Sequence, residues 1–383
     1  MIKIFLLLTI AITSVFTYGQ DVYYSAPIKI PMILSGSFAE LRNNHFHSGI
    51  DIKTQGTVNV MVYSVAEGSI SRILVSPSGY GNALYIDHNN GTTSVYGHLN
   101  EFRPDIQKYV KNIQYERKSF QVDIPVLPGI FQVNKNEKIA LSGNSGSSDG
   151  PHLHFELRNT KTEDPVNPLK FGFNIKDTTP PKIFALQISP LSESSHVNYS
   201  ANKVIFEVVQ SEGKYQIKNN PVIPVYGEIG FAIEANDYMD GSANKCGINS
   251  MELNIDNVIY SVFEINRFRF NQSKYINSFI DYEEFITSYR RFSKTWIEPC
   301  SKLTNFEFTE HNGIFDPGID AVHLIKIEIN DAYGNTSVIE FSVEGKYREM
   351  QPLSKESAPL FNCSQSNQMN TDEFSIEIPK DAL

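Results

Sequence analysis

The segment Gly150–Leu157, Gly-Pro-His-Leu-His-Phe-Glu-Leu, constrains the fold of this chain more than any other stretch. Polar and apolar residues alternate along it, and this period of two predicts a β-strand with one face in a core. His152 and His154 would then lie together on the opposite face. One strand would thus bring two imidazoles to one place, as a metal site or an acid–base site requires.

A second segment supplies a carboxylate that could complete such a site. Asp51 follows His47 by four residues, and a turn is expected at Ser48-Gly49. His47, Asp51 and one histidine of the 152–154 strand would form a set of two histidines and one aspartate. Catalytic zinc sites typically use three protein ligands and keep a position open for water, which ionises near neutral pH.

Six pieces of the sequence, in this order, resemble the zinc metallopeptidases of family M23, which are LytM-like or lysostaphin-like. The pieces are His47–Asp51, Ala66–Gly68, Gly79–Asn82, Tyr96–Leu99, Leu141–Gly146 and Gly150–Glu156. The resemblance extends over about residues 44–168. It implies a small, mostly antiparallel β-sheet with a groove across one face.

The resemblance also implies a role for five residues. His47, Asp51 and His154 match the zinc ligands, whereas His152 and His98 match the catalytic histidines that do not bind the metal. These two would activate the water and stabilise the tetrahedral oxyanion while zinc polarises the carbonyl. All five positions keep the residues of the family, which argues against the relatives that keep the fold without catalysis.

The other histidines are interpreted as structural or as surface residues. His45 also precedes Asp51 and competes with His47 as a ligand, but the family spacing favours His47. His88 ends an expected strand before the turn Asn89-Asn90-Gly91 and is assigned to a hairpin. The three histidines of the C-terminal half are expected at the surface. They are His196, His311 and His323.

Residues 1–19 are predicted to be a secretory signal peptide, with Lys3 before an apolar stretch too short to span a bilayer comfortably. No cysteine follows, so a lipoprotein anchor is not expected, and an uncleaved anchor is the alternative. The mature chain is predicted to be periplasmic or secreted, with no membrane span. That setting argues against the iron alternative, because the non-haem Fe(II) oxygenases with two histidines and a carboxylate work in reducing compartments.

The charge and the cysteines restrict the possible partners. The formal net charge is −10, and removal of residues 1–19 leaves 32 basic against 43 acidic side chains, or −11. A balance this acidic argues against nucleic acid as a partner. The chain has three cysteines, too few for a disulfide scaffold. An oxidising compartment would permit a bridge between Cys246 and Cys300.

Two mostly β domains are predicted. Residues 20–176 form the LytM-type peptidase domain, and the Pro180-Pro181 pair interrupts regular structure near its end. Residues 177–348 contain several alternating strands and are predicted to form an immunoglobulin-like β-sandwich. The polar segment 349–383 is expected to be a weakly ordered tail, from which Phe374–Ile378 could dock as one more strand.

Each domain carries an expected insert. The insert at about 103–132 should hold a helix near 104–116 and a strand near 120–124. Because it starts just after His98, it is expected to form one wall of the groove, and packing away from the groove is the alternative. The second insert, at about 264–318, should hold a helix near 282–292.

Aromatic side chains of the second domain offer a possible surface for a protein partner or for sugars, or they close a core. They are Tyr275, Tyr282, Tyr289 and Trp296. The predicted function is a zinc endopeptidase that cleaves stem or cross-bridge peptides of peptidoglycan. The alternatives are a non-catalytic wall-binding or amidase-regulating protein, and a carboxypeptidase that trims uncrosslinked stems.

Overall fold

A computed structural model describes most of the chain after residue 22. The described residues are 23–211, 213–349, 361–362, 364–371, 373–380 and 382. The predicted signal peptide at residues 1–19 therefore lies outside the described residues. Within the described residues, the helices are all too short or too polar to cross a bilayer.

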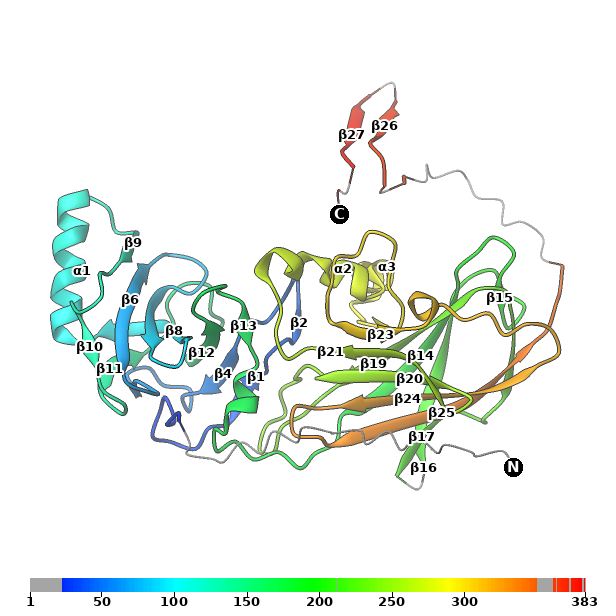
Figure 1. Cartoon of the computed structure of the whole chain (residues 1–383), viewed down its shortest axis with the longest axis horizontal. Coiled ribbons are helices and arrows are strands. Elements are labelled where there is room, and N and C mark those ends of the chain that lie inside the picture. The colour runs from blue at the N-terminus through cyan, green and yellow to red at the C-terminus, as the bar shows by residue number, and fades with distance from the viewer. Residues whose placement is uncertain are drawn as a thin grey trace, which may run out of the picture.

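The N-terminal half is built on a large antiparallel sheet (Figure 1). Its strands are β1 (Leu34–Gly36), β4 (Ile50–Lys53), β5 (Met61–Tyr63), β6 (Gly68–Val75), β7 (Asn82–His88), β8 (Thr92–Phe102), β9 (Val122–Pro125), β10 (Gln132–Val133), β11 (Lys138–Ser142), β12 (His152–Asn159) and β13 (Pro165–Val166). The central order is β1-β4-β12-β8-β7-β6-β10. Strand β12 confirms the expected alternation, because its three apolar side chains, Leu153, Phe155 and Leu157, are fully buried.

The C-terminal half is a two-layer β-sandwich. Its strands are β14 (Lys182–Pro190), β15 (His196–Val197), β16 (Val204–Ser211), β17 (Lys214–Ile217), β18 (Val222–Tyr226), β19 (Ile229–Asn236), β20 (Ser250–Ile255), β21 (Val258–Glu264), β22 (Ser293–Lys294), β23 (Phe306–Thr309), β24 (Val322–Asn330) and β25 (Thr336–Gly345). Strand β16 pairs with β14 in one layer and with β17 in the other. The rings of Phe231 and Phe341 meet across the core, 5.7 Å apart. The predicted β-sandwich is thus confirmed, whereas its assignment to the immunoglobulin-like fold stays a prediction.

Short helices and two small hairpins complete the chain. The helices are α1 (Pro104–Arg117), α2 (Ile276–Phe279) and α3 (Tyr282–Ser288), with 3-10 turns η1 (Pro168–Phe171), η2 (Phe270–Tyr275) and η3 (His311–Gly313). The hairpins are β2 (Leu41–Arg42) with β3 (His45–Phe46), and β26 (Asn367–Asn370) with β27 (Ser375–Ile378). Within the described residues, strand β27 pairs with β26 and with no strand of either half. Helices α1 and α3 confirm the two predicted helices.

The first insert extends the N-terminal sheet at the edge formed by β6. Helix α1 buries Ile106 and Val110 in the core of the N-terminal half. Strand β9 pairs with β6, which is separated from β12 by β7 and β8. In Figure 1, α1 lies at the end of the molecule far from the sandwich. Strand β9 nevertheless lines a pocket together with Arg158 of β12, so the role of the insert as a wall of the groove stays a prediction.

The two halves exchange core residues where they meet. Phe38 and Phe46 come from the N-terminal half but belong to the core of the sandwich. Met239 and Cys246 come from the sandwich but pack in the core of the N-terminal half. Neither core is complete without residues from the other half, so the two halves are expected to hold one fixed arrangement.

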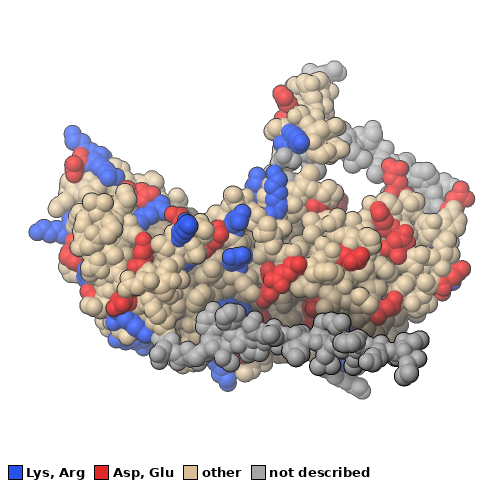
Figure 2. All heavy atoms as spheres, viewed as in Figure 1, with Lys and Arg blue, Asp and Glu red and all other residues tan. Residues whose placement is uncertain are grey.

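The cysteines and the charges complete the description. Cys246 is a buried free thiol, so the possible Cys246–Cys300 bridge is wrong. Cys300 is disulfide-bonded, and Cys363 lies outside the described residues. Figure 2 shows lysine and arginine side chains along the hollow between the two ends of the molecule, whereas acidic side chains are frequent at the sandwich end. The net negative charge is therefore unevenly distributed.

Candidate active site

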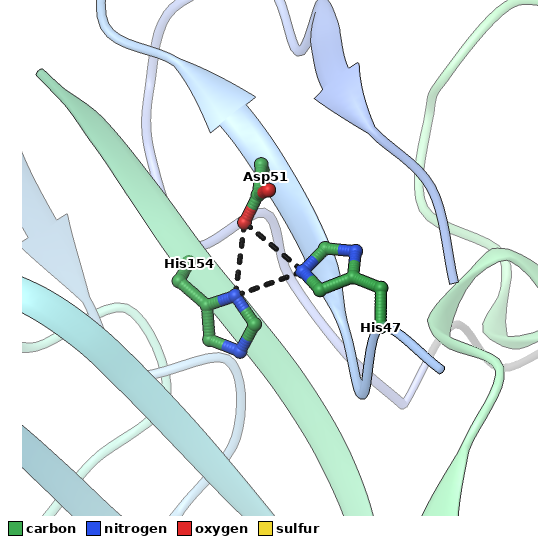
Figure 3. A group of neighbouring side chains, drawn as sticks. All are labelled: His47, Asp51 and His154. Atoms are coloured by element: carbon green, nitrogen blue, oxygen red, sulfur yellow. Dashed lines mark hydrogen bonds and ion pairs between the residues drawn. The ribbon is translucent and has the colours of Figure 1, made fainter. Parts of the chain in front are cut away.

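The three predicted metal ligands come together from adjacent elements. Asp51 in β4 and His154 in β12 are direct cross-strand partners, and His47 directly follows β3. All three are buried, with 3%, 5% and 4% of the surface of His47, Asp51 and His154 exposed. Figure 3 shows their side chains pointing towards one another. The pairing of β4 with β12 thus joins the two segments that the sequence placed far apart.

The three donor atoms form a nearly equilateral triangle. His47 Nε2 lies 3.1 Å from His154 Nδ1 and 3.2 Å from Asp51 Oδ1. His154 Nδ1 lies 2.9 Å from Asp51 Oδ1. Ligand atoms of a tetrahedral zinc ion lie about 3.3 Å apart, and those of an octahedral iron(II) ion lie about 3.0 Å apart. The triangle therefore fits a metal ion of either kind.

The outer atoms of His47 and Asp51 have fixed partners. His47 Nδ1 lies 2.7 Å from the carbonyl oxygen of Ser37, so Nδ1 carries the hydrogen and Nε2 keeps its lone pair. Arg42 donates to Asp51 Oδ2 at 2.5 Å. Such outer contacts orient metal ligands and fix the tautomer of a ligating histidine.

Glu156 performs the same task for His154 and is itself fully buried. His154 Nε2 donates to Glu156 Oε1 at 2.8 Å, which leaves Nδ1 to face the metal position. Ser48 and Tyr80 donate to the same oxygen at 2.5 and 2.7 Å. The other oxygen accepts a hydrogen bond from Arg158 at 2.6 Å. Every polar atom of the Glu156 carboxylate is therefore satisfied.

The charges around His154 favour a cation at its Nδ1. Burial alone would lower the pKa of His154, but hydrogen bonds to Asp51 and Glu156 raise this pKa to about 9. Burial would raise the pKa of the Asp51 carboxyl, yet the neighbouring histidines hold it well below its usual value.

The two predicted catalytic histidines lie beside this triangle. His152 Nε2 is 3.4 Å from Asp51 Oδ1, and its Nδ1 donates to the Gly150 carbonyl at 2.8 Å. His98 Nδ1 donates to the Ser145 carbonyl at 2.8 Å. The two ring centroids are 4.7 Å apart. Because each Nδ1 carries the hydrogen, each neutral ring offers Nε2 as a proton acceptor. Burial lowers the pKa of His98 to about 4, so this ring is neutral at pH 7.

A break in strand pairing places His98 at the site. Strand β8 pairs with β12 up to Gly97, which lies opposite His154, and His98 then adopts a φ of 57°. The pairing of β8 with both β7 and β11 is irregular here, as in a β-bulge that redirects a side chain. A Cβ atom at Gly97 would lie 3.3 Å from the Cβ of His154. The glycine thus leaves room for the ligand ring.

The remaining histidines lie away from the triangle. His45 is exposed and bonds to a backbone carbonyl, and His88 bonds to the Glu67 carbonyl and to Ser94, as a structural residue should. His311 is exposed as predicted. The prediction for His196 is wrong, because this ring is buried beside the rings of Tyr199 and Tyr226. His323 is half-buried and contacts Asp256 at 2.7 Å.

The second half of the chain holds the loop that carries His47. The neighbouring Phe46 is buried, and its ring lies 5.6 Å from that of Phe268. The Phe46 N–H donates to Ser273 Oγ at 2.8 Å. Ser37 is the residue whose carbonyl orients His47. Its hydroxyl oxygen Oγ accepts a hydrogen bond from the Gly247 N–H at 2.8 Å. The insert at 264–318 therefore has a role in positioning a metal ligand.

Several supporting residues were not found from the sequence. Glu156 and Arg158 continue the period of two that places His152 and His154 on one face, and this signal could have found them. Arg42 has no such signal, because a hairpin turn brings it to Asp51.

The four aromatic side chains considered for a partner surface differ in exposure. Tyr275 and Trp296 are buried, whereas Tyr282 and Tyr289 are 42% and 80% exposed.

An antiparallel sheet with a buried set of two histidines and one carboxylate, beside two further histidines, defines a candidate metallohydrolase. Residues 45–115 match the family model described as Peptidase family M23. This range contains His47, Asp51 and His98 and ends before β12. This part of the N-terminal half is therefore similar to peptidase family M23, in agreement with the order of the six sequence pieces.

Known proteins match limited parts of the chain. The DD-carboxypeptidase/endopeptidase Mpg of Neisseria meningitidis is 33% identical over 134 residues, which is 35% of this chain and 24% of Mpg. An uncharacterized metalloprotease of Haemophilus influenzae is 32% identical over 112 residues, 29% of this chain and 18% of that protein. A zinc-containing peptidase from Vibrio cholerae shares 26% identity over 37% of each chain, with a TM-score of 0.27. The chain thus spans about a quarter or less of these curated relatives.

Proposed function

We propose that this protein is a periplasmic or secreted zinc endopeptidase that hydrolyses amide bonds in peptidoglycan peptides. The observation that carries the proposal is the complete set of five side chains, with three donor atoms about 3 Å apart and two histidines beside them. The match of residues 45–115 to family M23 favours zinc over iron. A further relative, 32% identical over 111 residues, is named a peptidoglycan DD-endopeptidase of Vibrio cholerae, and this name suggests peptidoglycan peptides as the substrate class.

The residues divide the work by position. His47, Asp51 and His154 would hold zinc, which when bound polarises the scissile carbonyl and makes a water molecule nucleophilic. His152 and His98 present Nε2 atoms that can accept the proton of the water. Once protonated, either ring can donate to the oxyanion or to the leaving amine.

Buried partners keep this geometry fixed before substrate arrives. The carbonyl oxygens of Gly150 and Ser145 hold the two catalytic rings, and Glu156 holds His154. Preorganised groups of this kind need no rearrangement during the reaction. A fully supported site favours an active enzyme over a non-catalytic, wall-binding or regulatory relative.

The test is to incubate the chain without residues 1–19 with purified muropeptides and to identify the products by mass spectrometry, with and without a chelator. The expected products are the two fragments of a cleaved cross-link, and their formation should need zinc. His152→Ala should keep stoichiometric zinc but lose turnover, whereas His154→Ala should lose both. His45→Ala, at an exposed histidine outside the triangle, is the matched control.

Other outcomes separate the alternatives. Release of terminal residues from uncrosslinked stems alone would identify a carboxypeptidase. A wild-type protein that binds one zinc ion per chain and cleaves no muropeptide would support the non-catalytic alternative and overturn the proposal.

A further inference from the structure

A second buried group of carboxylates lies where the two halves meet. Asp177 belongs to the connector before β14, Asp237 follows β19, and Asp331 follows β24. They are 8%, 3% and 2% exposed. One oxygen from each carboxylate lies within 4.8 Å of the other two. None of the three residues belongs to the M23 site.

Two of these carboxylates have an oxygen without a partner. Asp177 Oδ2 and Asp237 Oδ1 are buried and accept no hydrogen bond from the described residues. Asp331 is different, because its oxygens accept from Asn335 N and Nδ2 at 2.9 and 2.7 Å. Buried ionised groups are normally paired or bound to a metal. The unpartnered oxygens therefore point to a ligand that the protein itself does not supply.

The charge of the cluster indicates that this ligand is a cation. In the described part of the chain, no lysine or arginine forms an ion pair with these carboxylates, and the nearby Lys176 pairs with Asp240 instead. Three carboxylates whose oxygens lie within 4.8 Å of one another repel one another when ionised, and a bound cation would relieve this repulsion.

Asp177 and Asp237 line a small pocket of about 10 Å³. This is roughly the volume that one water-sized guest needs. Tyr333 lines the same pocket, and its hydroxyl is a third buried polar atom without a partner among the described residues. The two carboxylates with unpartnered oxygens therefore lie beside a space that could hold an ion.

We propose that Asp177, Asp237 and Asp331 bind one calcium ion at the place where the two halves of the molecule meet. Sites made only of oxygen atoms suit calcium and magnesium rather than zinc. Calcium binds carboxylate oxygens at about 2.3–2.6 Å and tolerates irregular geometry. Magnesium demands a nearly octahedral shell and usually keeps several water molecules, which a buried set of three carboxylates suits less well.

An ion at the aspartate cluster would influence the active site indirectly, through the segment that orients His47. Ser37 and Phe38 line the same cavity as Asp177 and Asp237. The carbonyl oxygen of Ser37 is the group that orients His47. A calcium ion here would hold the connector and two loops of the sandwich against the segment that supports a predicted zinc ligand.

The test is to titrate calcium chloride into the chain without residues 1–19 by calorimetry and to measure its melting temperature at each calcium concentration. The experiment uses the wild type and His154→Ala, which lacks a predicted zinc ligand. Comparing the two proteins distinguishes calcium binding at the M23 site from calcium binding at the aspartate cluster. Both should bind one calcium ion per chain and melt at a higher temperature with calcium. Asp237→Asn should bind calcium at least tenfold more weakly, and Asp240→Asn, at an acid beside the cluster, should bind normally.

Folding and the rival explanations are controlled in the same experiment. Asp237→Asn removes a repulsive charge without changing the side-chain shape, so it should melt no lower than the wild type in the absence of metal. The proposal is overturned if the wild type binds no calcium up to about 10 mM, as expected for a cluster held by a buried water or shared protons. Equal calcium affinity in Asp237→Asn and the wild type would also overturn it.

Discussion

The His47–Asp51–His154 triangle and the Asp177–Asp237–Asp331 cluster are both buried, but their surroundings differ. In the triangle, each ligand has an outer partner: the Ser37 carbonyl, Arg42 or Glu156. In the cluster, two carboxylate oxygens have no partner among the described residues. The triangle also mixes nitrogen with oxygen donors, whereas the cluster has only oxygen donors. These differences suit zinc in the first case and calcium in the second.

The comparison shows that the two sites depend on the interface in different ways. The triangle is formed within one sheet by β4 and β12, and the second half only supports the His47 loop. The cluster is formed by the connector and two loops of the sandwich, and Asp177 and Asp237 line a pocket with Ser37 and Phe38 of the N-terminal half. Variants at each site should therefore separate catalysis from the stability of the interface.

The largest expected effect is a loss of catalysis in a variant of the triangle but not in a variant of the cluster. His154→Ala should reduce muropeptide cleavage by on the order of 10³-fold or more, because a zinc ligand and the charge that it holds are lost. Asp237→Asn should retain zinc and most of the activity when calcium is absent from both proteins. Product formation and zinc content, measured for both variants, give the comparison. An Asp237→Asn protein that loses its zinc would show that the two sites are not separate.

The second effect tests the support that the sandwich gives to His47. Phe46→Ala should lower the free energy of unfolding by about 3–5 kcal/mol, as for other buried aromatic truncations. It should also weaken zinc binding, because Phe46 precedes His47 and anchors it in the sandwich core.

The matched control is Phe341→Ala, a buried phenylalanine of the sandwich core that lies away from the ligand loop. It should cost a similar amount of stability, measured by urea unfolding, and should leave zinc affinity unchanged. Equal zinc affinity in the two folded variants would argue against a positioning role for Phe46.

A smaller effect is expected from Glu156→Gln. Loss of the charge weakens the hold on His154 and leaves Arg158 buried without its carboxylate partner. Changes to such outer contacts typically lower metal affinity by about 10–100-fold. Zinc affinity can be measured by competition with a chromophoric chelator. Asp123→Asn, which removes an exposed partner of Arg72, should leave this affinity unchanged.

The difference between the two sites also explains what could be predicted from the sequence. The triangle has a local pattern, because alternation in β12 and the four-residue spacing from His47 to Asp51 place side chains on known faces. The cluster has no such pattern: Asp177, Asp237 and Asp331 are isolated acids at element ends far apart in the chain. Only the packing of the connector against two loops of the sandwich brings them together.

The fold shows the same division between local and long-range information. Alternation and helical spacing predicted β12, α1 and the strands of the sandwich, since these depend on neighbouring residues. The pairing partner of β9 could not be predicted, because alternation within a strand does not encode which sheet edge the strand joins. The exchange of Phe46 into the sandwich core was missed for the same reason.

The smallest effect concerns the pH dependence of stability without metal. Burial and the charges of Asp177 and Asp331 raise the pKa of Asp237 to about 8, and burial raises that of Asp177 to about 6. The other titratable groups that face the cluster are Tyr333, Cys246 and Asp240. An unfolded aspartate has a pKa of about 3.9.

Between about pH 4 and pH 8 the native state therefore binds more protons than the unfolded state, and stability falls as the pH rises. The contribution of Asp177 and Asp237 to the free energy of unfolding is fully present below about pH 4. This contribution is lost as the pH rises through their two native pKa values. Urea unfolding in a chelating buffer should show Asp237→Asn and the wild type to be similar at pH 5, and the variant to be more stable at pH 8. Calcium should remove this difference by stabilising the wild type, whereas a difference that is equal at both pH values would show that Asp237 does not carry the effect.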